Sequence, residues 1–130
     1  MVSLLIVSHS AQLAAGVKEF AEQVAGGKVQ IADAGGAADG SLGTSVDHIQ
    51  ERLRQVASSD GTLVLVDLGS AVLSVEMAIE ALGANQVQIS DAPLVEGAYL
   101  AAIEASAEGT TLAQVAEAAL LARDLIKVHT

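Results

Sequence analysis

The repeated pairing of a short apolar segment with a longer segment of helical periodicity constrains the fold of this chain most strongly. The clearest apolar segment covers residues 62–69, with the sequence TLVLVDLG. Consecutive apolar residues predict a strand that is covered on both faces, which is typical of the centre of a parallel sheet. Weaker segments predict three more strands, at residues 3–8, 28–33 and 85–90.

Helical periodicity follows each of these segments. Residues 11–25 place apolar side chains at helical spacing, and Gly26 and Gly27 end that pattern. Strands that alternate with helices predict an α/β three-layer sandwich with about four mainly parallel strands, in the order 2-1-3-4, and helices on both faces. We expect one domain over residues 1–130. The other predicted helices cover residues 46–56, 70–82, 94–107 and a last segment from Thr110 or Thr111 to about Lys127.

The composition argues against several classes of partner. Only 2% of the 130 residues are aromatic, so the core must be aliphatic and no aromatic platform is present on which bases could stack. The formal net charge of -10 would repel the phosphates of nucleic acids and an anionic membrane surface. Cysteine is absent, which excludes thiolate catalysis and Cys-based zinc sites.

The sequence also indicates where the protein works. Its first residues lack the basic region and cleavage boundary of a signal peptide. No apolar run reaches the roughly 18–20 residues that a membrane-spanning helix requires. The three histidines are scattered without ligand-like spacing. We therefore expect a cytoplasmic protein with no metal site and no cofactor of its own.

Candidate functional residues follow the predicted strands. His9 comes directly after the first strand, and Asp67 lies at the end of the third. A glycine-rich segment, residues 35–43, follows the second strand. In a sheet of order 2-1-3-4 the first and third strands are neighbours and the second flanks the first. Because the carboxyl ends of parallel strands meet at one edge, we expect these three features to lie together.

A histidine beside a carboxylate has a defined chemical use. The carboxylate accepts a hydrogen bond from one ring nitrogen, which leaves the other nitrogen with a lone pair. That nitrogen can act as a general base or as a nucleophile towards phosphorus. Amides at the start of a helix suit anions, so a phosphoryl group would find donors there. The predicted catalytic residues are His9 and Asp67, and the predicted phosphate-binding residues are Ser10, Gly36, Gly69 and Ser70.

Simpler interpretations of the same residues stay open. His9 could be a polar residue that ends a strand, and the glycine-rich segment could be a flexible connection, since its spacing matches neither a Walker loop nor G-x-G-x-x-G. Ser8 and Ser10 flank His9 in the sequence, where neither reliably reaches its ring, so no catalytic triad is predicted. His48 and His129 are interpreted as ordinary polar residues.

Four blocks of sequence together resemble one family. They are LLIVSHSAQLAAGV, AGGAADGSLGTS, LVLVDLGSAVLSVEMAIE and DAPLVEGAYLAA. In this order they resemble the phosphotransferase subunits of PTS-dependent dihydroxyacetone kinases, whose domain is similar to the mannose-type enzyme IIA. The match to mannose transporters is looser. Those usually have His-Gly after the first strand and a longer D-L-F-G-G-S-P-type block, whereas this chain has His9-Ser10 and the shorter DLGSA at residues 67–71.

The resemblance implies roles for these residues and for partners. His9 would accept a phosphoryl group from the carrier protein HPr and pass it to ADP on the kinase's nucleotide-binding subunit, while Asp67 orients the ring. The family also implies a homodimer. Apart from the resemblance, glycines let two backbones approach closely, so we expect the glycine-rich segment to shape the docking face around His9. Two alternatives stay open: a sugar-transport enzyme IIA component, and a non-catalytic module that binds a small anion at the same edge.

Overall fold

Four parallel strands form the central sheet of the computed structural model, which describes residues 1–129. Their order is β2-β1-β3-β4, and all three neighbouring pairs are parallel. The predicted fold class and strand order are therefore confirmed. The strands are β1 (Ser3–Ser8), β2 (Ile31–Gly35), β3 (Thr62–Val66) and β4 (Val87–Ile89).

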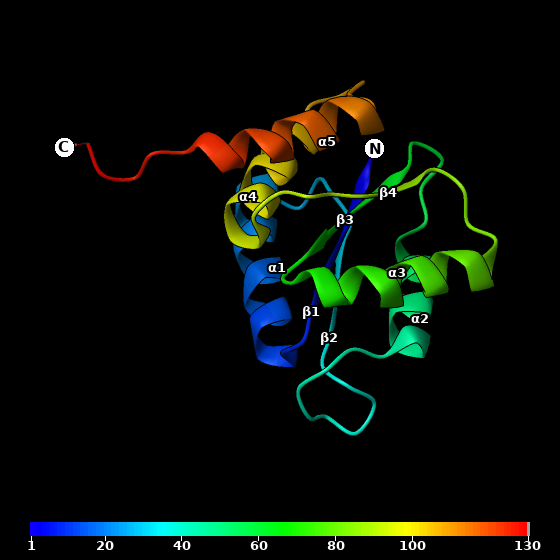
Figure 1. Ribbon diagram of the computed structural model, residues 1–130. Helices are drawn as coiled ribbons and strands as arrows, with labels where there is room; N and C mark the ends of the chain where they lie inside the picture. The colour runs from blue at the N-terminus through cyan, green and yellow to red at the C-terminus, as the bar shows by residue number, and fades with distance from the viewer. Residues whose placement is uncertain (130) are drawn as a thin grey trace.

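Helices cover both faces of the sheet (Figure 1). One face packs against α1, α4 and α5, and the other against α2 and α3. In residues 1–129, no helix combines the length and the apolar character needed to cross a membrane. The helices are α1 (Ala11–Ala25), α2 (Val46–Val56), α3 (Gly69–Leu82), α4 (Leu94–Ala105), α5 (Leu112–Leu120) and the short 3-10 helix η1 (Leu121–Asp124).

The continuous apolar sequence of the central strands follows from this arrangement. In β1, Leu4 and Ile6 pack towards α1, α4 and α5, whereas Leu5 and Val7 pack towards α2 and α3. All four side chains are fully buried. Successive side chains of a strand point to opposite faces, so a sheet with helices on both sides needs apolar residues at every position.

Several strand boundaries differ from the predicted ones. The second strand runs from Ile31 to Gly35 rather than over residues 28–33, because the Lys28 amide still donates to the Ala25 carbonyl in the turn that ends α1. The third strand ends at Val66 and not at residue 69. Asp67 turns the chain there, with its own carboxylate accepting the next amide.

The predictions for the fourth strand and for the last two helices were too long. β4 covers only residues 87–89, because Gln86 adopts a positive φ of 59° that no strand accommodates. α4 ends at Ala105 rather than at residue 107. α5 and η1 end at Asp124 rather than near Lys127. Beyond η1 the large apolar residues are exposed, so no buried face supports another turn.

Candidate functional site

A two-residue connection between β1 and α1 carries the candidate nucleophile, His9. Ser10 caps α1, since its hydroxyl oxygen accepts a hydrogen bond from the Leu13 amide at 3.1 Å. The His9 backbone is held on both sides of its Cα: its amide donates to Asp67 Oδ2 at 2.9 Å, and its carbonyl accepts from the Gly43 amide at 2.9 Å. The ring therefore projects from a fixed backbone.

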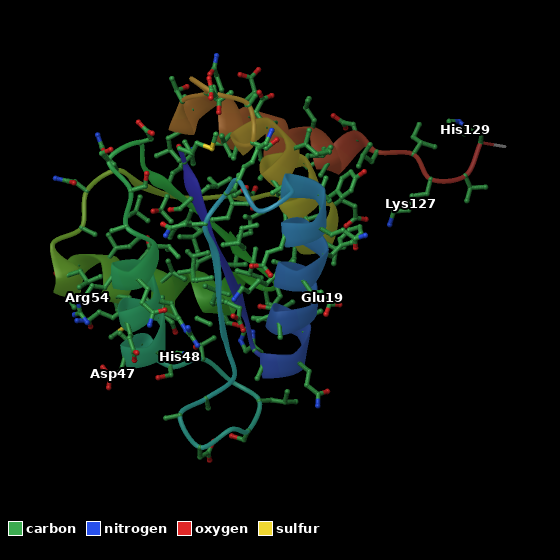
Figure 2. All side chains as sticks on the ribbon, turned by 180° about the vertical axis from the view of Figure 1, so that it is seen from behind. Glu19, Asp47, His48, Arg54, Lys127 and His129 are labelled. Carbon is green, nitrogen blue, oxygen red and sulfur yellow. The ribbon has the colours of Figure 1, made fainter. Side chains whose placement is uncertain are left out.

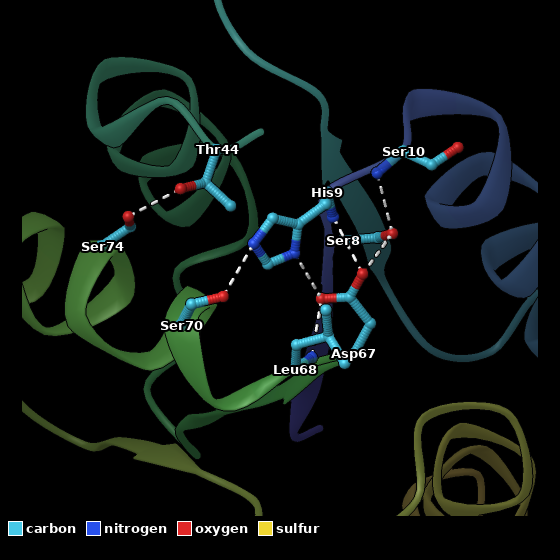
Figure 3. Close-up of polar contacts among 8 residues, drawn as sticks. All are labelled: Ser8, His9, Ser10, Thr44, Asp67, Leu68, Ser70 and Ser74. Atoms are coloured by element: carbon cyan, nitrogen blue, oxygen red, sulfur yellow. Dashed lines mark hydrogen bonds and ion pairs between the residues drawn. The ribbon is translucent and has the colours of Figure 1, made fainter. Parts of the chain in front are cut away.

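Asp67 makes four hydrogen bonds at the centre of the site (Figure 3). Its Oδ2 accepts from the Ser8 hydroxyl and from the His9 amide, both at 2.9 Å. Its Oδ1 accepts from the Leu68 amide at 2.8 Å and lies 3.0 Å from His9 Nδ1. The carboxylate thereby joins the end of β1 to the connection between β3 and α3.

These hydrogen bonds keep Asp67 ionised. Burial of the carboxyl group raises its pKa, but the His9 amide, the His9 ring, the Ser8 hydroxyl and the Leu68 amide together outweigh this effect. The pKa of Asp67 therefore lies below its ordinary value. An ionised carboxylate can only accept hydrogen bonds, so the shared proton belongs to His9 Nδ1. In the neutral ring, the lone pair is then on His9 Nε2.

His9 Nε2 faces the beginning of α3. Ser70 Oγ lies 2.9 Å from Nε2, and its hydroxyl donates because Nε2 carries the lone pair. Leu68, the N-cap of α3, makes no side-chain capping hydrogen bond. Among residues 1–129, no protein acceptor is bonded to the amides of Gly69 or Ser70. A helix start with free amides suits an anion.

The glycine-rich segment after β2 is anchored at its base beside the site. The Gly43 amide donates to the His9 carbonyl. The next residue is Thr44, whose Oγ1 lies 2.7 Å from Ser74 Oγ of α3 (Figure 3). Residues 38–42, at the tip, are exposed. The base of the segment therefore supports the His9 backbone and α3, while the tip is available to other molecules.

The structure places the other predicted site residues close to this centre. Some of their backbone amides already donate hydrogen bonds within the protein, and others do not. The Ser10 amide donates to Ser8 Oγ at 3.0 Å, and the Gly36 amide donates to the Ser8 carbonyl at 3.1 Å. Gly69 opens α3 with a free amide, next to Ser70. Binding of phosphate by these residues stays a prediction.

Sequence reasoning missed Ser8. As expected, its hydroxyl is not bonded to the His9 ring, but it donates to Asp67 and accepts from the Ser10 amide. The available signal was a serine at the carboxyl end of a central strand whose four inner residues are apolar, since a buried hydroxyl requires partners.

The other two histidines belong to α2 and to the C-terminal segment (Figure 2). His48 Nε2 accepts a hydrogen bond from Arg52 Nε at 3.3 Å, within α2. Residues 1–129 contain no group of three or more His, Cys, Asp or Glu side chains that could hold a metal ion.

A cleft of about 550 Å³ adjoins Asp67, Leu68 and Gly69. It is lined by residues that follow β3 and β4, by the first turns of α3, and by Arg123. His9 is not among the lining residues. The ring, whose side chain is 26% exposed, is therefore reached from the protein surface rather than through this cleft.

The comparison with known families decides the classification. The model of the EIIA-man family, described as PTS system fructose IIA component, matches residues 3–116. The chain belongs to this family. The similarity to mannose-type enzyme IIA that the sequence blocks indicated is thereby confirmed.

Relatives of this EIIA-man chain include phosphoryl donor subunits named DhaM. That of PEP-dependent dihydroxyacetone kinase 2 from Listeria innocua serovar 6a is 38% identical over 107 residues, which are 80% of this chain and 86% of the relative. That of Escherichia coli K12 is 42% identical over 112 residues, which are 82% of this chain but 24% of the relative. This chain thus spans most of one relative and about a quarter of the other.

Solved structures support the same fold. A crystal structure of a protein of unknown function matches with a TM-score of 0.77 at 38% identity, covering 92% of both chains. The mannose/sorbose-specific IIA subunit of the phosphotransferase system from Enterococcus faecalis matches with a TM-score of 0.60 at 20% identity, covering 98% of this chain and 94% of its own. At that identity the second match concerns the fold alone.

Proposed function

We propose that this EIIA-man chain is a phosphohistidine relay of a dihydroxyacetone kinase, working in the cytoplasm. His9 would accept a phosphoryl group on Nε2 from a phosphohistidine of HPr and pass it to ADP on the kinase's nucleotide-binding subunit. One observation carries the proposal. Asp67 Oδ1 lies 3.0 Å from His9 Nδ1 and accepts its hydrogen bond, which leaves the Nε2 lone pair at the exposed start of α3. The names of the DhaM relatives, phosphoryl donor subunits, support it.

Each transfer exchanges one bond to phosphorus for another. In the first, the Nε2 lone pair attacks phosphorus while the N–P bond of the carrier breaks and its electron pair returns to the carrier's ring. In the second, a β-phosphate oxygen of ADP attacks, and the electron pair of the N–P bond returns to His9 Nε2. Asp67 keeps Nδ1–H in place and stabilises the positive charge of the phosphorylated ring.

The start of α3 would hold the phosphoryl group between the two transfers. Phosphorylation of Nε2 displaces the Ser70 hydroxyl from the lone pair, and the hydroxyl can then donate to a phosphoryl oxygen. The free amides of Gly69 and Ser70 supply further donors. The amides of Ser10 and Gly36 would join them only by leaving Ser8, to which both now donate.

Exposed leucines lie on the elements that carry this polar centre, and they favour a protein partner over a small anion. They belong to the first turn of α1, the tip of the glycine-rich segment, the β3–α3 connection and α3. An apolar rim of this kind is typical of a surface that docks other proteins. The residues are Leu13, Leu42, Leu68 and Leu73, between 42% and 79% exposed.

We also propose that the chain forms a homodimer through α4. The exposed positions of α4 are Val95, Tyr99 and Ile103, all of them large and apolar. Phe20 of α1 stacks on Tyr99 with ring centroids 5.3 Å apart. Because the three α4 residues are spaced evenly around Tyr99, two antiparallel copies of α4 would pair Val95 with Ile103 of the second copy. Such self-complementarity suits a two-fold interface.

Phosphate transfer from purified carriers tests the relay. The protein is incubated with enzyme I, HPr and phosphoenolpyruvate, and acid-labile, base-stable phosphate is measured by phosphorus NMR. We expect one phosphoryl group on wild type, none on His9→Ala, and loss of the signal when ADP-loaded kinase subunit is added. Equal phosphate on wild type and His9→Ala would contradict the proposal.

The same reactions separate the alternatives. Transfer to a membrane sugar permease domain, but not to ADP on the kinase subunit, would identify a sugar-transport enzyme IIA component. Binding of a small anion without acceptance from HPr would identify a regulatory module.

A further inference from the structure

Ser8 is a buried polar residue to which the relay described above assigns no role. It is the last residue of β1, pairs with Gly35 of β2 and is fully buried. Its hydroxyl donates to Asp67 Oδ2 at 2.9 Å and accepts from the Ser10 amide at 3.0 Å. One hydroxyl therefore connects the start of α1 to the carboxylate that follows β3.

We propose that Ser8 is a positioning residue that fixes the rotation of the Asp67 carboxylate and thereby keeps Oδ1 on His9 Nδ1. This inference rests on the proposed relay. The terminal torsion of an aspartate is broad and roughly two-fold, so the side-chain rotamer alone does not hold the carboxyl plane. The donors around each oxygen must hold it.

Ser8 and the His9 amide together hold Oδ2. Both donors lie 2.9 Å from this oxygen, which directs Oδ1 towards the Leu68 amide and the His9 ring. The Ser10 amide occupies a lone pair of the Ser8 hydroxyl, which leaves the hydroxyl proton directed towards Asp67. Without the hydroxyl, Oδ2 keeps only the His9 amide, and the Ser10 amide has no acceptor.

Ser3 provides a matched control on the same strand. It is also a buried serine of β1, and its hydroxyl bonds the Val56 carbonyl at 2.6 Å and Thr62 Oγ1 at 2.8 Å. Ser3 lies at the opposite end of β1 from His9. Ser3→Ala and Ser8→Ala therefore remove the same group from the same strand, but only Ser8→Ala removes a donor from Asp67.

The first measurement is nitrogen-15 NMR of the unphosphorylated His9 ring. In wild type and in Ser3→Ala we expect the signature of one tautomer, with the proton on Nδ1. In Ser8→Ala we expect Nδ1 and Nε2 shifts that move towards the average of two tautomers, because Asp67 no longer holds Nδ1–H firmly. Ser8→Thr, which keeps the hydroxyl, should restore the wild-type signature.

The second measurement is the rate of phosphate acceptance from phosphorylated HPr. Loss of the carboxylate that orients a histidine typically costs 10–100-fold in metal sites. Because Ser8→Ala leaves Asp67 in place, we expect a smaller loss, up to about 10-fold. Ser3→Ala should stay within about twofold of wild type. In an Asp67→Ala background, Ser8→Ala should cause no further loss, because Ser8 acts through Asp67.

The outcomes separate the two proposals. If wild type accepts no phosphate on His9, the relay is wrong, and the ring spectra still test Ser8. If Ser8→Ala and Ser3→Ala give the same spectra and rates, or if the Ser8 and Asp67 losses multiply, Ser8 has no positioning role. Should Ser8→Ala not fold, Ser8→Cys replaces it, since a thiol has similar size and donates only weakly.

Discussion

At the scale of single residues, one hydrogen bond decides which nitrogen of His9 would be the nucleophile of the proposed relay. Asp67 holds Nδ1 at 3.0 Å and is itself held by donors from three residues. The lone pair is consequently on Nε2, beside Ser70 and the free amides of α3. In the proposed relay, the chemistry would depend on the carboxylate that orients the histidine as much as on the histidine.

Asp67→Asn tests this dependence. An amide group has one acceptor oxygen and one donor NH2, so in either rotation it places a donor against the His9 amide or against Nδ1–H. We expect phosphate acceptance from HPr to fall by about 10–100-fold. Circular dichroism should show that the fold is kept. An unchanged rate in a folded variant would remove Asp67 from the mechanism.

The lowered pKa of Asp67 also predicts how stability depends on pH. Because its pKa is lower in the folded than in the unfolded chain, Asp67 stabilises the fold above the unfolded value, near 3.9, and loses this effect as the pH falls through the folded value. Wild type should therefore exceed Asp67→Ala in unfolding free energy at pH 7, with the difference shrinking below about pH 4.

Urea denaturation at a series of pH values measures this difference. Asp39, an exposed aspartate whose pKa is also lowered by hydrogen bonds from Ser41, provides the control. Its replacement by alanine should leave the pH dependence close to that of wild type, because exposed contacts contribute little. A difference between wild type and Asp67→Ala that stays constant down to pH 2 would contradict the pKa assignment.

At the scale of elements, the close contact between β2 and the start of α1 sets the position of His9. Gly35 ends β2, and a Cβ there would lie 2.5 Å from the Ser10 carbonyl oxygen and 2.7 Å from Ala11 Cα. Both neighbours are backbone atoms, so they cannot move aside without shifting α1. A side chain at residue 35 would displace the connection that carries His9.

Gly35→Ala should therefore lower both stability and activity. We expect a loss of about 1–3 kcal/mol from overpacking and a clear fall in phosphate acceptance, measured by urea denaturation and by the HPr assay. Gly16→Ala is the matched control, because a Cβ on this exposed residue of α1 meets nothing within 4 Å. It should stabilise the protein by up to about 1 kcal/mol. Equal stability of the two variants would refute the packing argument.

At the scale of the whole molecule, the proposed relay and the proposed dimer would use different surfaces. His9 is surrounded by the start of α1, the glycine-rich segment and α3, whereas the apolar face lies on α4 with Phe20 beside it. Figure 1 also shows the C-terminal segment projecting from the body near α4. A dimer through α4 would leave both copies of the relay site open to their partners.

Replacement of Ile103 by glutamate tests the dimer. A charge on the exposed face of α4 would have to be buried between the two copies, so Ile103→Glu should give a monomer of 13.1 kDa where wild type has about twice that mass. Light scattering after size exclusion measures the mass. Met77→Glu, on the exposed face of α3, should stay dimeric. A monomeric wild type at tens of micromolar would reject the interface.

The pattern of apolar residues along the chain determined the fold class, because the polarity of each residue and its spacing to the next indicate which positions are buried. The apolar run at Thr62–Val66 required helices on both faces of β3, and the alternation of strands and helices then placed His9 and Asp67 at one edge. Element ends were harder to predict, since the turn at Asp67 and the positive φ of Gln86 interrupt segments whose composition resembles a strand.

The hydrogen-bond partners within the site were decided only by the tertiary structure. Ser8 meets Asp67 across 59 positions of sequence, and Ser70 meets His9 across 61. Such pairs depend on strand register and on side-chain rotamers, which a one-dimensional pattern of polarity does not record. The same reason explains why the contact between Asp67 and His9 Nδ1, and the apolar face of α4, could be identified only from the packed structure.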